Sequence, residues 1–481
     1  MPQVNVNSRD LTVPVGTCLS DLLHDLPHPC GGKGVCGKCK VRAWGALSPL
    51  STEEQRHLTA LEVADGVRLA CCTTVQGDCR VETFDTAPLS ICTEGEELPM
   101  VVNPGFARYG AAVDIGTTTL AARLYAADGS LLAEGGAPNP QSAYGADVIS
   151  RVEAAVKGQP LTAVIRTALC RLLTDLTAQA GVATTDLDEI VLTGNTVMLT
   201  LLIGGDVAPF ATAPFTGYSH FGEVLSLLDY PNAAVYCAPC AAAFLGGDTT
   251  AALMATDLKP GELLLDIGTN GEMVLNADGR LYACSTAAGP AFEGVGISCG
   301  GIAAPGAIDR VELAGGTLYP HVLGGGEATG ICGSGLVDTL ACLALLDEDA
   351  PITLAPGVTL TAEDVAALLM SKSAIRSGID TLLHTAEMTP KDLTGIIVAG
   401  GFGRFLNSQN ALRIGLLPPI SPERIRTVGN AALDGTSRLL LDTAQRETAC
   451  QLAQTIQVVD LATNPYFATR FMENMTLEVP R

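Results

Sequence analysis

The sequence predicts an α/β protein of more than one domain, and three observations carry this prediction. The chain has 481 residues, which is long enough for two or three domains with a sizeable core. Three cysteines lie on one glycine-rich loop, in HPCGGKGVCGKCKVR (28–42). A hydrophobic strand, Asp-Ile-Gly-Thr and a second strand occur in this order twice, in AAVDIGTTTLAARLY (111–125) and LLLDIGTNGEMVLN (263–276). We therefore expect a small first unit followed by two similar lobes that face a cleft.

Composition and charge indicate a globular chain and exclude some classes of partner. The chain is 47% hydrophobic and 4% aromatic, and its formal net charge is -23. Nucleic-acid phosphates require a basic face, so this charge argues against nucleic acid. No apolar run reaches the ~18 residues that a membrane-spanning helix needs, and MPQVNVNSRD at the N-terminus lacks the layout of a signal peptide. We expect no membrane association and a cytoplasmic location.

Residues 1–86 are predicted to form the first unit. VNVN and LTVPVG alternate like the two strands of a hairpin, and CLSDLLHDL has a short helical apolar face. After the cysteine loop, KVRAW is predicted to be a strand, and VRLACCTTVQGDCRVETF the returning strands. Between them, Ser51 lies three residues before Glu54, which is a capping-box start for a helix. Residues 87–107 are acidic, contain proline and lack periodicity, so we interpret them as a linker.

The spacing of the cysteines indicates a metal-binding loop. Cys30, Cys36 and Cys39 follow a C-x5-C-x2-C pattern, and Cys71 follows after a long interval in RLAC. A [2Fe-2S] cluster needs four thiolates that converge from a loop and a separate strand. The glycines of the loop let the backbone fold around a cluster and bring amide N–H groups near the sulfurs. The alternatives are a zinc site, which usually uses two C-x2-C pairs, and a set of unligated thiols.

This first unit resembles the plant-type and adrenodoxin-type ferredoxins, which have a β-grasp fold. In the pattern of that family the fourth ligand is the cysteine of the R-L-A-C element, here Cys71. The resemblance implies a [2Fe-2S] cluster held by Cys30, Cys36, Cys39 and Cys71. Cys72 is the neighbouring alternative, and because consecutive residues on a strand point to opposite faces, only one of the two is expected to ligate. Cys79 and Cys92 are interpreted as strand and linker cysteines.

The two Asp-Ile-Gly-Thr segments are typical of phosphate-binding hairpins. Gly116 and Gly268 let each turn approach phosphates, to which threonine hydroxyls and turn amides donate. Asp114 and Asp266 can hold the hydrated Mg²⁺ that neutralises a triphosphate. A third element, IIVAGGFGRFLN (396–407), is predicted to be a buried strand that enters a glycine-rich turn, where an adenosine can lie against bare backbone. The alternative is that all three are plain turns of an α/β domain.

Together these elements resemble the ATPase superfamily of acetate and sugar kinases, heat-shock chaperones and actin, which has a two-lobed RNase H-like fold. The resemblance covers residues 108 to about 440 and implies an ATPase domain over 108–481, with lobes at about 108–260 and 261–481. The nucleotide-binding residues that it implies are Asp114, Gly116, Thr117 and Thr118 in the first loop, Asp266, Gly268, Thr269 and Asn270 in the second, and Gly400, Gly401 and Gly403 at the adenosine. A carboxylate before the second hairpin often positions water in this superfamily, which nominates Asp248; its alternative role is a helix N-cap.

Two further segments are less specific. GICGSGLVD (330–338) is expected to line the nucleotide cleft, with Gly333 and Ser334 approaching phosphate. CAPC (237–240) has redox spacing but leads into a helix within an Ala-rich stretch, so its cysteines are interpreted as core. The six histidines show no catalytic or metal-like arrangement.

A ferredoxin and an ATPase in one chain resemble the reductive activators of corrinoid proteins. The matching phrases are PCGGKGVCGKCKVR, LSPLSTEE, RLAC, AVDIGTTTLAARL, NPQSAYGADVISRV, LTGNTVM, LLLDIGTNGEMVL, GICGSGLVD and VAGGFG. The resemblance implies an ATP-dependent one-electron reduction of a Co(II) corrinoid to Co(I), with the cluster as donor, in a methyltransferase system of anaerobic metabolism. It implies the corrinoid protein and an upstream low-potential electron donor as partners, and relatives are often homodimers.

The chain departs from the family pattern in two respects. Its C-terminus lacks the cysteines that hold [4Fe-4S] clusters in some members, and the segment between ferredoxin and ATPase is short beside relatives that have an extra linker domain and middle domain. One alternative is an activator of the 2-hydroxyacyl-CoA dehydratase type, whose [4Fe-4S] cluster is held by cysteines inside the ATPase. Another is an ATP-gated scaffold that uses the cluster as a redox sensor. The ferredoxin-like unit disfavours the first, and also a metabolite kinase.

Overall fold

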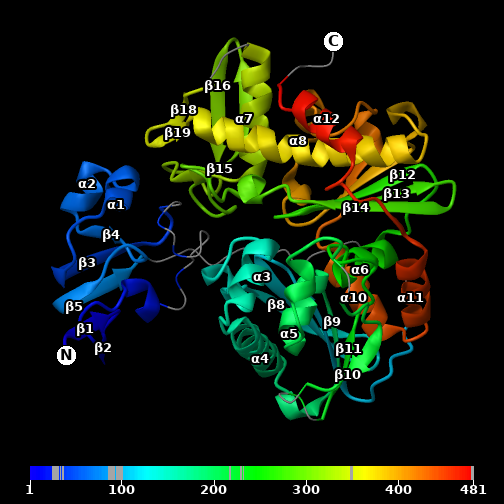
Figure 1. Cartoon of the computed structure of the whole chain (residues 1–481), viewed down its shortest axis with the longest axis horizontal. Coiled ribbons are helices and arrows are strands. Elements are labelled where there is room, and N and C mark those ends of the chain that lie inside the picture. Colours follow the sequence, from blue (N-terminus) through cyan, green and yellow to red (C-terminus); the bar gives the residue numbers. More distant parts are fainter. Residues whose placement is uncertain are drawn as a thin grey trace. The chain divides into compact units, whose positions relative to one another are not determined.

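The protein is described from a computed structural model in two compact units, each taken by itself (Figure 1). The first unit comprises Met1–Pro88 and Pro140–Gln159, and the second Leu89–Asn139 and Pro160–Arg481. The residues that the structure describes are 1–23, 26, 32, 34, 37–84, 93, 101–215, 218–227, 230, 232–346 and 350–477. Within these ranges, none of the helices combines the length and the apolar character that crossing a bilayer requires.

The first unit is built on a mixed five-stranded sheet, in the order β2-β1-β5-β3-β4. Its strands are β1 (Gln3–Val6), β2 (Arg9–Thr12), β3 (Lys40–Leu47), β4 (Val67–Leu69) and β5 (Val75–Thr83). β1 and β2 form the expected antiparallel hairpin, and β1 pairs in parallel with β5 at the centre of the sheet. This is the arrangement of a β-grasp sheet, so the predicted fold of the unit is confirmed.

The first unit also contains short helices. They are η1 (Leu19–Leu22), α1 (Thr52–His57), α2 (Ala60–Ala64), η2 (Pro140–Ala143) and α3 (Val148–Val156). α1 begins at the predicted capping box, since Ser51 Oγ accepts from the Glu54 N–H at 3.1 Å and Glu54 Oε2 accepts from the Ser51 N–H at 3.0 Å. In the described part of CLSDLLHDL, only the four-residue 3-10 turn η1 forms.

Two six-stranded sheets of the same plan form the second unit. The first has the order β10-β11-β9-β6-β7-β8. Its strands are β6 (Tyr109–Ile115), β7 (Thr119–Ala126), β8 (Leu131–Pro138), β9 (Leu187–Gly194), β10 (Glu223–Leu225) and β11 (Ala234–Cys237). β6, β7 and β8 form an antiparallel meander, β9 is parallel to β6, and β11 is parallel to β9.

The second sheet repeats this arrangement, in the order β21-β20-β12-β13-β14-β22. Its strands are β12 (Glu262–Ile267), β13 (Gly271–Ala277), β14 (Arg280–Thr286), β20 (Gly395–Ala399), β21 (Ile425–Thr427) and β22 (Gln457–Val458). β12, β13 and β14 form the meander, β20 is parallel to β12, and β21 is parallel to β20. The internal repeat predicted from the two Asp-Ile-Gly-Thr segments is therefore confirmed in the topology, as is the two-lobed α/β fold.

Some α-helices of the second unit pack on its two sheets, and others pack on one another or on the smaller sheets. They are α4 (Leu161–Gln179), α5 (Thr196–Ile203), α6 (Gly247–Thr256), α7 (Gly333–Leu346), α8 (Ala362–Thr385), α9 (Ser408–Arg413), α10 (Ala431–Leu441), α11 (Gln445–Thr455) and α12 (Pro465–Glu473), with the 3-10 turns η3 (Thr184–Asp186), η4 (Ala208–Phe210), η5 (Pro290–Glu293), η6 (Pro390–Asp392), η7 (Gly403–Phe405) and η8 (Pro422–Arg424). α4 packs on β7 and β8, and α8 packs on β13 and β14.

An insertion between β14 and β20 carries two small sheets that the sequence analysis did not predict. Their strands are β15 (Ala307–Ala314), β16 (Thr317–Val322), β17 (Gly330–Ile331), β18 (Ile352–Ala355) and β19 (Val358–Leu360). β15 pairs with β16 and β17, and α7 packs against β15. The glycine-dense segments before α7 therefore connect short strands.

Helix α10 packs on the first sheet, although in sequence it follows the second. It contacts α6, β6 and β9, and its Leu433 and Leu440 share a core with Val191 of β9. Where α10 meets α6, a Cβ on Gly435 would lie 1.8 Å from the Ala251 carbonyl oxygen, so only glycine permits this approach. The predicted boundary between the lobes, at about residue 260, places α10 in the second lobe. Its packing on the first sheet could not be predicted, because the apolar face of a helix does not reveal which sheet it covers.

Candidate functional site

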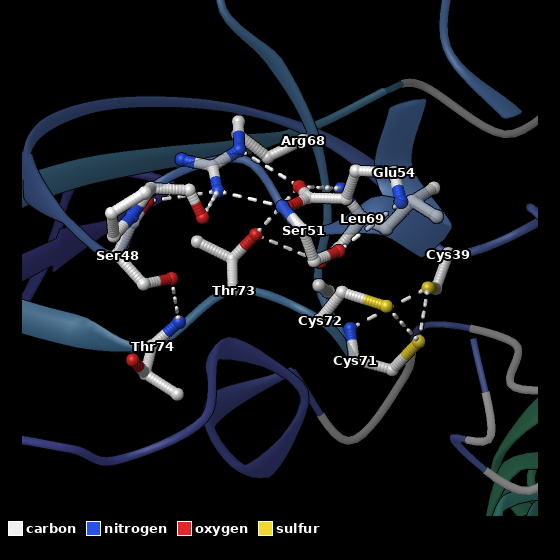
Figure 2. A network of polar contacts seen from close by, with 12 residues as sticks. Cys39, Ser48, Ser51, Glu54, Arg68, Leu69, Cys71, Cys72, Thr73 and Thr74 are labelled. Carbon is white, nitrogen blue, oxygen red and sulfur yellow. Dashed lines mark hydrogen bonds and ion pairs between the residues drawn. The ribbon is translucent and has the colours of Figure 1, made fainter. Parts of the chain in front are cut away.

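Cys39 and Cys71 meet in the first unit. Cys39 directly precedes β3 and Cys71 lies in the turn after β4, and their Sγ atoms are 3.2 Å apart (Figure 2). The Cys71 N–H points at Cys39 Sγ over 3.5 Å, and the Ala70 N–H donates to the Cys39 carbonyl at 2.8 Å. An N–H directed at a sulfur favours the thiolate. The structure thus brings two of the four predicted ligands together, while Cys30 and Cys36 lie outside the described residues.

Cys72 lies beside this pair but has a different environment. Its Sγ is 3.6 Å from that of Cys71, and its side chain hydrogen-bonds with Ser51. Burial, followed by the neighbouring Cys71, raises the pKa of the Cys72 thiol to about 12. Both cysteines lie in a turn, in which the Cys72 N–H donates to the Leu69 carbonyl at 2.9 Å. The alternation of side chains along a strand therefore does not decide which of the two cysteines is the ligand. What distinguishes Cys71 is its contact with Cys39.

Glu54 holds the cysteine turn (residues 70–73) in place. Its buried Oε1 accepts hydrogen bonds from Arg68 Nε at 2.8 Å, from the Leu69 N–H at 3.1 Å and from Thr73 Oγ1 at 3.0 Å (Figure 2). Burial alone would raise the pKa of Glu54, but the hydrogen bonds from Arg68 and from backbone N–H groups outweigh it and lower the pKa to about 2. Glu54 is therefore an ionised carboxylate that fixes both ends of the turn.

The loop around the cysteines fits a metal cluster. Gly34 and Gly37 have φ values of +72° and +65°. A Cβ on Gly34 would lie 2.9 Å from Cys72 Sγ, and one on Gly37 would lie 2.9 Å from His57 Cγ. Only glycine satisfies both conditions, and the main chain can therefore run close to the sulfurs. The Cys39–Cys71 pair supplies two of the thiols that a thiolate-ligated cluster requires, and Gly34 brings the main chain close to Cys72 Sγ.

Three predicted carboxylates meet in the second unit. Asp114 is the second-last residue of β6, Asp266 is the second-last residue of β12, and Asp248 is the second residue of α6. Burial raises the pKa of Asp114 and of Asp266 to about 7, and the Asp248 charge adds to both shifts. Burial also raises the pKa of Asp248, to about 6. We call these three residues the carboxylate cluster.

Asp248 does not cap its helix. The N-cap of α6 is Gly246, and Asp248 Oδ1 accepts from the next backbone N–H, that of Thr249, at 2.7 Å. The alternative role that the sequence left open is therefore wrong for this residue. Its carboxylate lies instead within electrostatic reach of Asp114 and Asp266.

Three polar residues that the sequence analysis did not single out adjoin the carboxylate cluster. Asn430, the N-cap of α10, donates from Nδ2 to Asp114 Oδ2 at 3.0 Å. Glu272 of β13 adds a carboxyl whose pKa is raised well above its ordinary value, first by burial and then by the neighbouring aspartates. Thr193, paired with Asp114 across β9 and β6, is buried, and its hydroxyl has no hydrogen-bond partner among the described residues. Asn430 and Asp114 are 316 positions apart, so no local pattern could reveal their contact.

The two hairpin turns converge on a third residue. Thr118 Oγ1 and Thr269 Oγ1 are 3.2 Å apart. Thr118 donates to Glu293 Oε2 at 2.8 Å and Thr269 donates to Glu293 Oε1 at 3.2 Å. The predicted facing hairpins are therefore in direct contact, and Glu293 on η5 accepts from both. The sequence signal for Glu293 was weak, because it is a lone acid in the segment GPAFEG.

Close backbone contacts pack the glycine turns around this site. A Cβ on Gly246 would lie 2.4 Å from the Gly194 carbonyl oxygen, and one on Gly194 would lie 2.6 Å from that of Ile115. Gly400, with φ +90°, follows β20 directly, and a Cβ there would lie 2.6 Å from Asp266 Oδ1. The segment predicted to bind adenosine therefore touches the second hairpin.

The remaining predicted binding residues lie in or beside these turns. They are Gly116 and Thr117 after β6, Gly268 and Asn270 after β12, and Gly401 and Gly403 after β20. Gly333 and Ser334 begin α7, and the Ser334 hydroxyl donates to the Asp309 carbonyl at 2.7 Å. A Cβ on Gly333 would lie 2.1 Å from the Phe292 carbonyl oxygen. The hydroxyl expected to approach phosphate is thus bound to a backbone carbonyl, and Gly333 packs against η5.

The CAPC cysteines lie in the core, as interpreted. Cys237 and Cys240 are both buried. Burial raises the pKa of Cys237 to about 12 and that of Cys240 far above its ordinary value. Thiols in this state are neither nucleophiles nor metal ligands at neutral pH.

Three family models together match most of the chain. Residues 4–76 match a 2Fe-2S iron-sulfur cluster binding domain, residues 109–260 the RACo middle region, and residues 261–349 and 345–480 the C-terminal domain of RACo, the ASKHA domain. The expectation that the chain lacks the middle domain of longer relatives is therefore wrong. The first sheet, which resembles the second closely enough to suggest a single ATPase, is the part that matches the middle region.

Individual relatives agree with these matches. The corrinoid activation enzyme RamQ of Eubacterium limosum is 31% identical over 413 residues, 76% of this chain and 70% of that protein. The [Co(II) methylated amine-specific corrinoid protein] reductase of Methanosarcina barkeri is 31% identical over 246 residues, 44% of this chain and 45% of that protein. The solved structure of a reductive activator for corrinoid, iron-sulfur protein has a TM-score of 0.71 with this chain at 24% identity, covers 99% of it and 98% of its own chain, and shows the same fold.

Proposed function

Since this chain belongs to the RACo family of corrinoid activation proteins, we propose that it reduces the inactive Co(II) form of a corrinoid protein to Co(I) and uses ATP to do so. The observation that carries the proposal is the presence of both sites in one chain. The Cys39–Cys71 thiol pair would serve electron transfer, and the two facing Asp-Ile-Gly-Thr hairpins would serve phosphate binding. We propose the corrinoid protein of a methyltransferase system as the partner that receives the electron.

The first unit would hold the cluster through Cys39 and Cys71, with Cys30 and Cys36 as the other two predicted ligands. When bound, a [2Fe-2S] cluster supplies one electron at a time, at about -400 mV in plant-type ferredoxins. The chain's own residues prepare this site. Glu54 fixes the cysteine turn, and the Cys71 N–H points at the Cys39 sulfur, where it stabilises a thiolate.

We propose that the carboxylate cluster holds the Mg²⁺ that accompanies ATP. Mg²⁺ keeps several waters and usually takes only one or two protein carboxylates, so a closed cage of protein ligands is not required. Among the described residues, no three His, Cys, Asp or Glu side chains are arranged to hold a metal ion directly. Asp114 and Asp266 would bind hydrated Mg²⁺ from the two hairpins, and Asp248 would orient the attacking water.

ATP has a physical role in such a reaction. When a one-electron acceptor is harder to reduce than its donor, the equilibrium constant for electron transfer falls tenfold for every ~59 mV between their reduction potentials. A nucleotide held by both hairpins favours the arrangement of the two sheets in which the hairpins are close, and ATP binding can therefore shift the population of conformers that the partner binds. Through this shift, an unfavourable transfer to Co(II) becomes possible.

The test is Co(I) formation by two variants with opposite defects. Wild-type protein, pre-reduced without oxygen, is mixed with a Co(II) corrinoid protein of a methylamine methyltransferase system, and Co(I) absorbance is followed with and without Mg-ATP. We expect ATP-dependent Co(I) formation by the wild type. Asp266→Asn should keep the cluster spectrum and lose the ATP effect, whereas Cys39→Ser should lose the cluster and keep ATP hydrolysis.

Cys170→Ser is the matched control, because Cys170 is a half-buried cysteine of α4 that belongs to neither site. It should behave as the wild type. Absence of Co(I) with every corrinoid protein tried, while the cluster spectrum and ATP turnover are intact, would contradict the proposal. The ATP-gated scaffold would then be favoured.

A further inference from the structure

Glu293 joins the two hairpins that are proposed to bind phosphate. Its carboxylate accepts from the Thr118 hydroxyl at 2.8 Å and from the Thr269 hydroxyl at 3.2 Å. Thr118 follows β6 and Thr269 follows β12, so the equivalent turns of the two sheets hold one side chain. Glu293 belongs to neither hairpin, because it lies on η5 beyond β14. Its carboxylate therefore lies where hydroxyl donors from the turns of both sheets reach the same group.

A carboxylate at this point uses the donors that a phosphate would need. The hydroxyls of Thr118 and Thr269 are the groups expected to donate to nucleotide phosphates. The segment predicted to bind adenosine follows β20, on the second sheet only, so the phosphate that both sheets reach is the one farthest from the adenosine. Carboxylate and phosphoryl oxygens are both anionic acceptors, and like charges cannot share these two donors without strong repulsion.

The surroundings of Glu293 are already rich in negative charge. Asp266 lies within electrostatic reach of both Asp248 and Glu293. A terminal phosphate that enters here adds to this charge. Departure of the Glu293 carboxylate removes one negative charge from the place where the phosphate arrives.

The backbone beneath Glu293 is anchored. The preceding Phe292 is 2% exposed, and its ring lies 5.4 Å from that of Phe402, which belongs to the adenosine segment. Gly294 ends the turn with φ +77°, and a Cβ there would lie 2.6 Å from the Gly301 nitrogen. Glu293 itself is only half-buried. Its carboxylate can therefore leave the threonines by a change of rotamer, without movement of η5.

We propose that Glu293 occupies the position of the terminal phosphate in the nucleotide-free protein and that ATP, but not ADP, displaces it. This proposal rests on the proposed function, because it takes the hairpins to be the nucleotide site. With ADP bound, the carboxylate keeps both threonine donors. With ATP bound, the terminal phosphate takes them and the like charge drives the side chain away. Glu293 is then the residue that distinguishes the triphosphate from the diphosphate.

The test compares two nucleotides on three full-length proteins. Dissociation constants for ADP and for a non-hydrolysable ATP analogue, each with Mg²⁺, are measured by calorimetry for wild type, Glu293→Gln and Glu327→Gln. Glu327 is an exposed glutamate in the loop before β17, so its variant removes the same charge away from the hairpins. We expect Glu293→Gln to bind the analogue roughly tenfold more tightly, which corresponds to about 1.4 kcal/mol, with ADP affinity unchanged. Glu327→Gln should match the wild type.

A second variant separates charge from contact. Glu293→Ala removes the bridge as well as the charge, so amide hydrogen exchange at 115–120 and 268–272 should be faster than in the wild type without nucleotide and should slow when the analogue binds. Unchanged or weaker binding of the analogue by Glu293→Gln, or a loss of hydrolysis alone, would overturn the proposal. If the wild type binds neither nucleotide, the nucleotide site itself is wrong and the proposed function fails with it.

Discussion

At the scale of single residues, the two sites use buried carboxylates in opposite ways. Glu54 is buried with Arg68 and backbone donors, so its pKa falls to about 2 and it stays ionised. Asp114 and Asp266 are buried with other acids, so their pKa values rise to about 7. The first arrangement stabilises a fold. The second costs stability, because burial disfavours each charged carboxylate and the neighbouring acids repel it.

Cys71 and Cys72 offer a matched pair for the fourth ligand. Cys71→Ser should lose the visible absorbance of the cluster, because its sulfur is the one that lies 3.2 Å from Cys39. Cys72→Ser should keep it, because the Cys72 thiol has a pKa of about 12 and its side chain is bound to Ser51. Visible absorbance and iron content of the two purified variants check this. Loss of iron in Cys72→Ser alone would assign the ligand to Cys72.

Removing the Glu54 charge should unfold the cysteine turn. Glu54→Gln leaves Arg68 without its carboxylate in a buried setting, which typically costs about 3–5 kcal/mol. The first unit should therefore lose its cluster at a clearly lower temperature than in the wild type. The loss of visible absorbance during heating measures this temperature. Glu62→Gln is the control, because the Lys40–Glu62 pair is about one-third exposed and such pairs contribute about 0–1 kcal/mol. Equal midpoints for the two variants would show that the network does not support the turn.

At the scale of elements, the sequence predicted individual strands and helices better than it predicted which elements pack against them. The paired Asp-Ile-Gly-Thr segments predicted two hairpins correctly, because a strand–turn–strand unit is encoded locally, but the third strand of each meander was not predicted. The side of the molecule that α10 covers was not predictable, since its contact with α6 and β9 depends on residues far away in sequence. The short strands β15 to β19 were missed, although β16 and β18 alternate between more and less buried residues.

The docking of α12 on α8 should depend on pH. Lys372 of α8 is buried and donates to the carbonyls of Asn474 and Thr476, each at 2.7 Å. Burial, then the nearby Arg376, lowers its pKa from 10.5 to about 8. Between these values the unfolded chain holds a proton that the folded chain has released, so stability rises with pH across this window.

Wild type should therefore gain about 2 kcal/mol from this residue between pH 7.5 and pH 9.5. Lys372→Met cannot titrate and should lack this gain. Urea unfolding of both proteins at the two pH values checks the difference in slope, and the other titrating groups cancel in the comparison. Parallel pH profiles would show that Lys372 keeps its ordinary pKa.

At the scale of the whole molecule, the combination of sites carries the function. Cysteine spacing and the repeated hairpin motif were enough to predict a ferredoxin-like unit and a two-lobed α/β region, and the family matches agree. Residues that act across long sequence separations were not predictable. Asn430 reaches Asp114, and Glu293 joins Thr118 to Thr269, through the packing of the two sheets alone. These contacts join parts of the chain that no local sequence pattern connects.

The most direct test of the central claim is an electron count in a single turnover. Pre-reduced protein, freed of other reductants, is mixed with an equal amount of a Co(II) corrinoid protein, and cluster oxidation and Co(I) formation are recorded together before and after addition of Mg-ATP. We predict that one Co(I) appears for each cluster oxidised, and only after ATP is added. A cluster that stays reduced after ATP, or Co(I) that forms equally without it, would contradict the account.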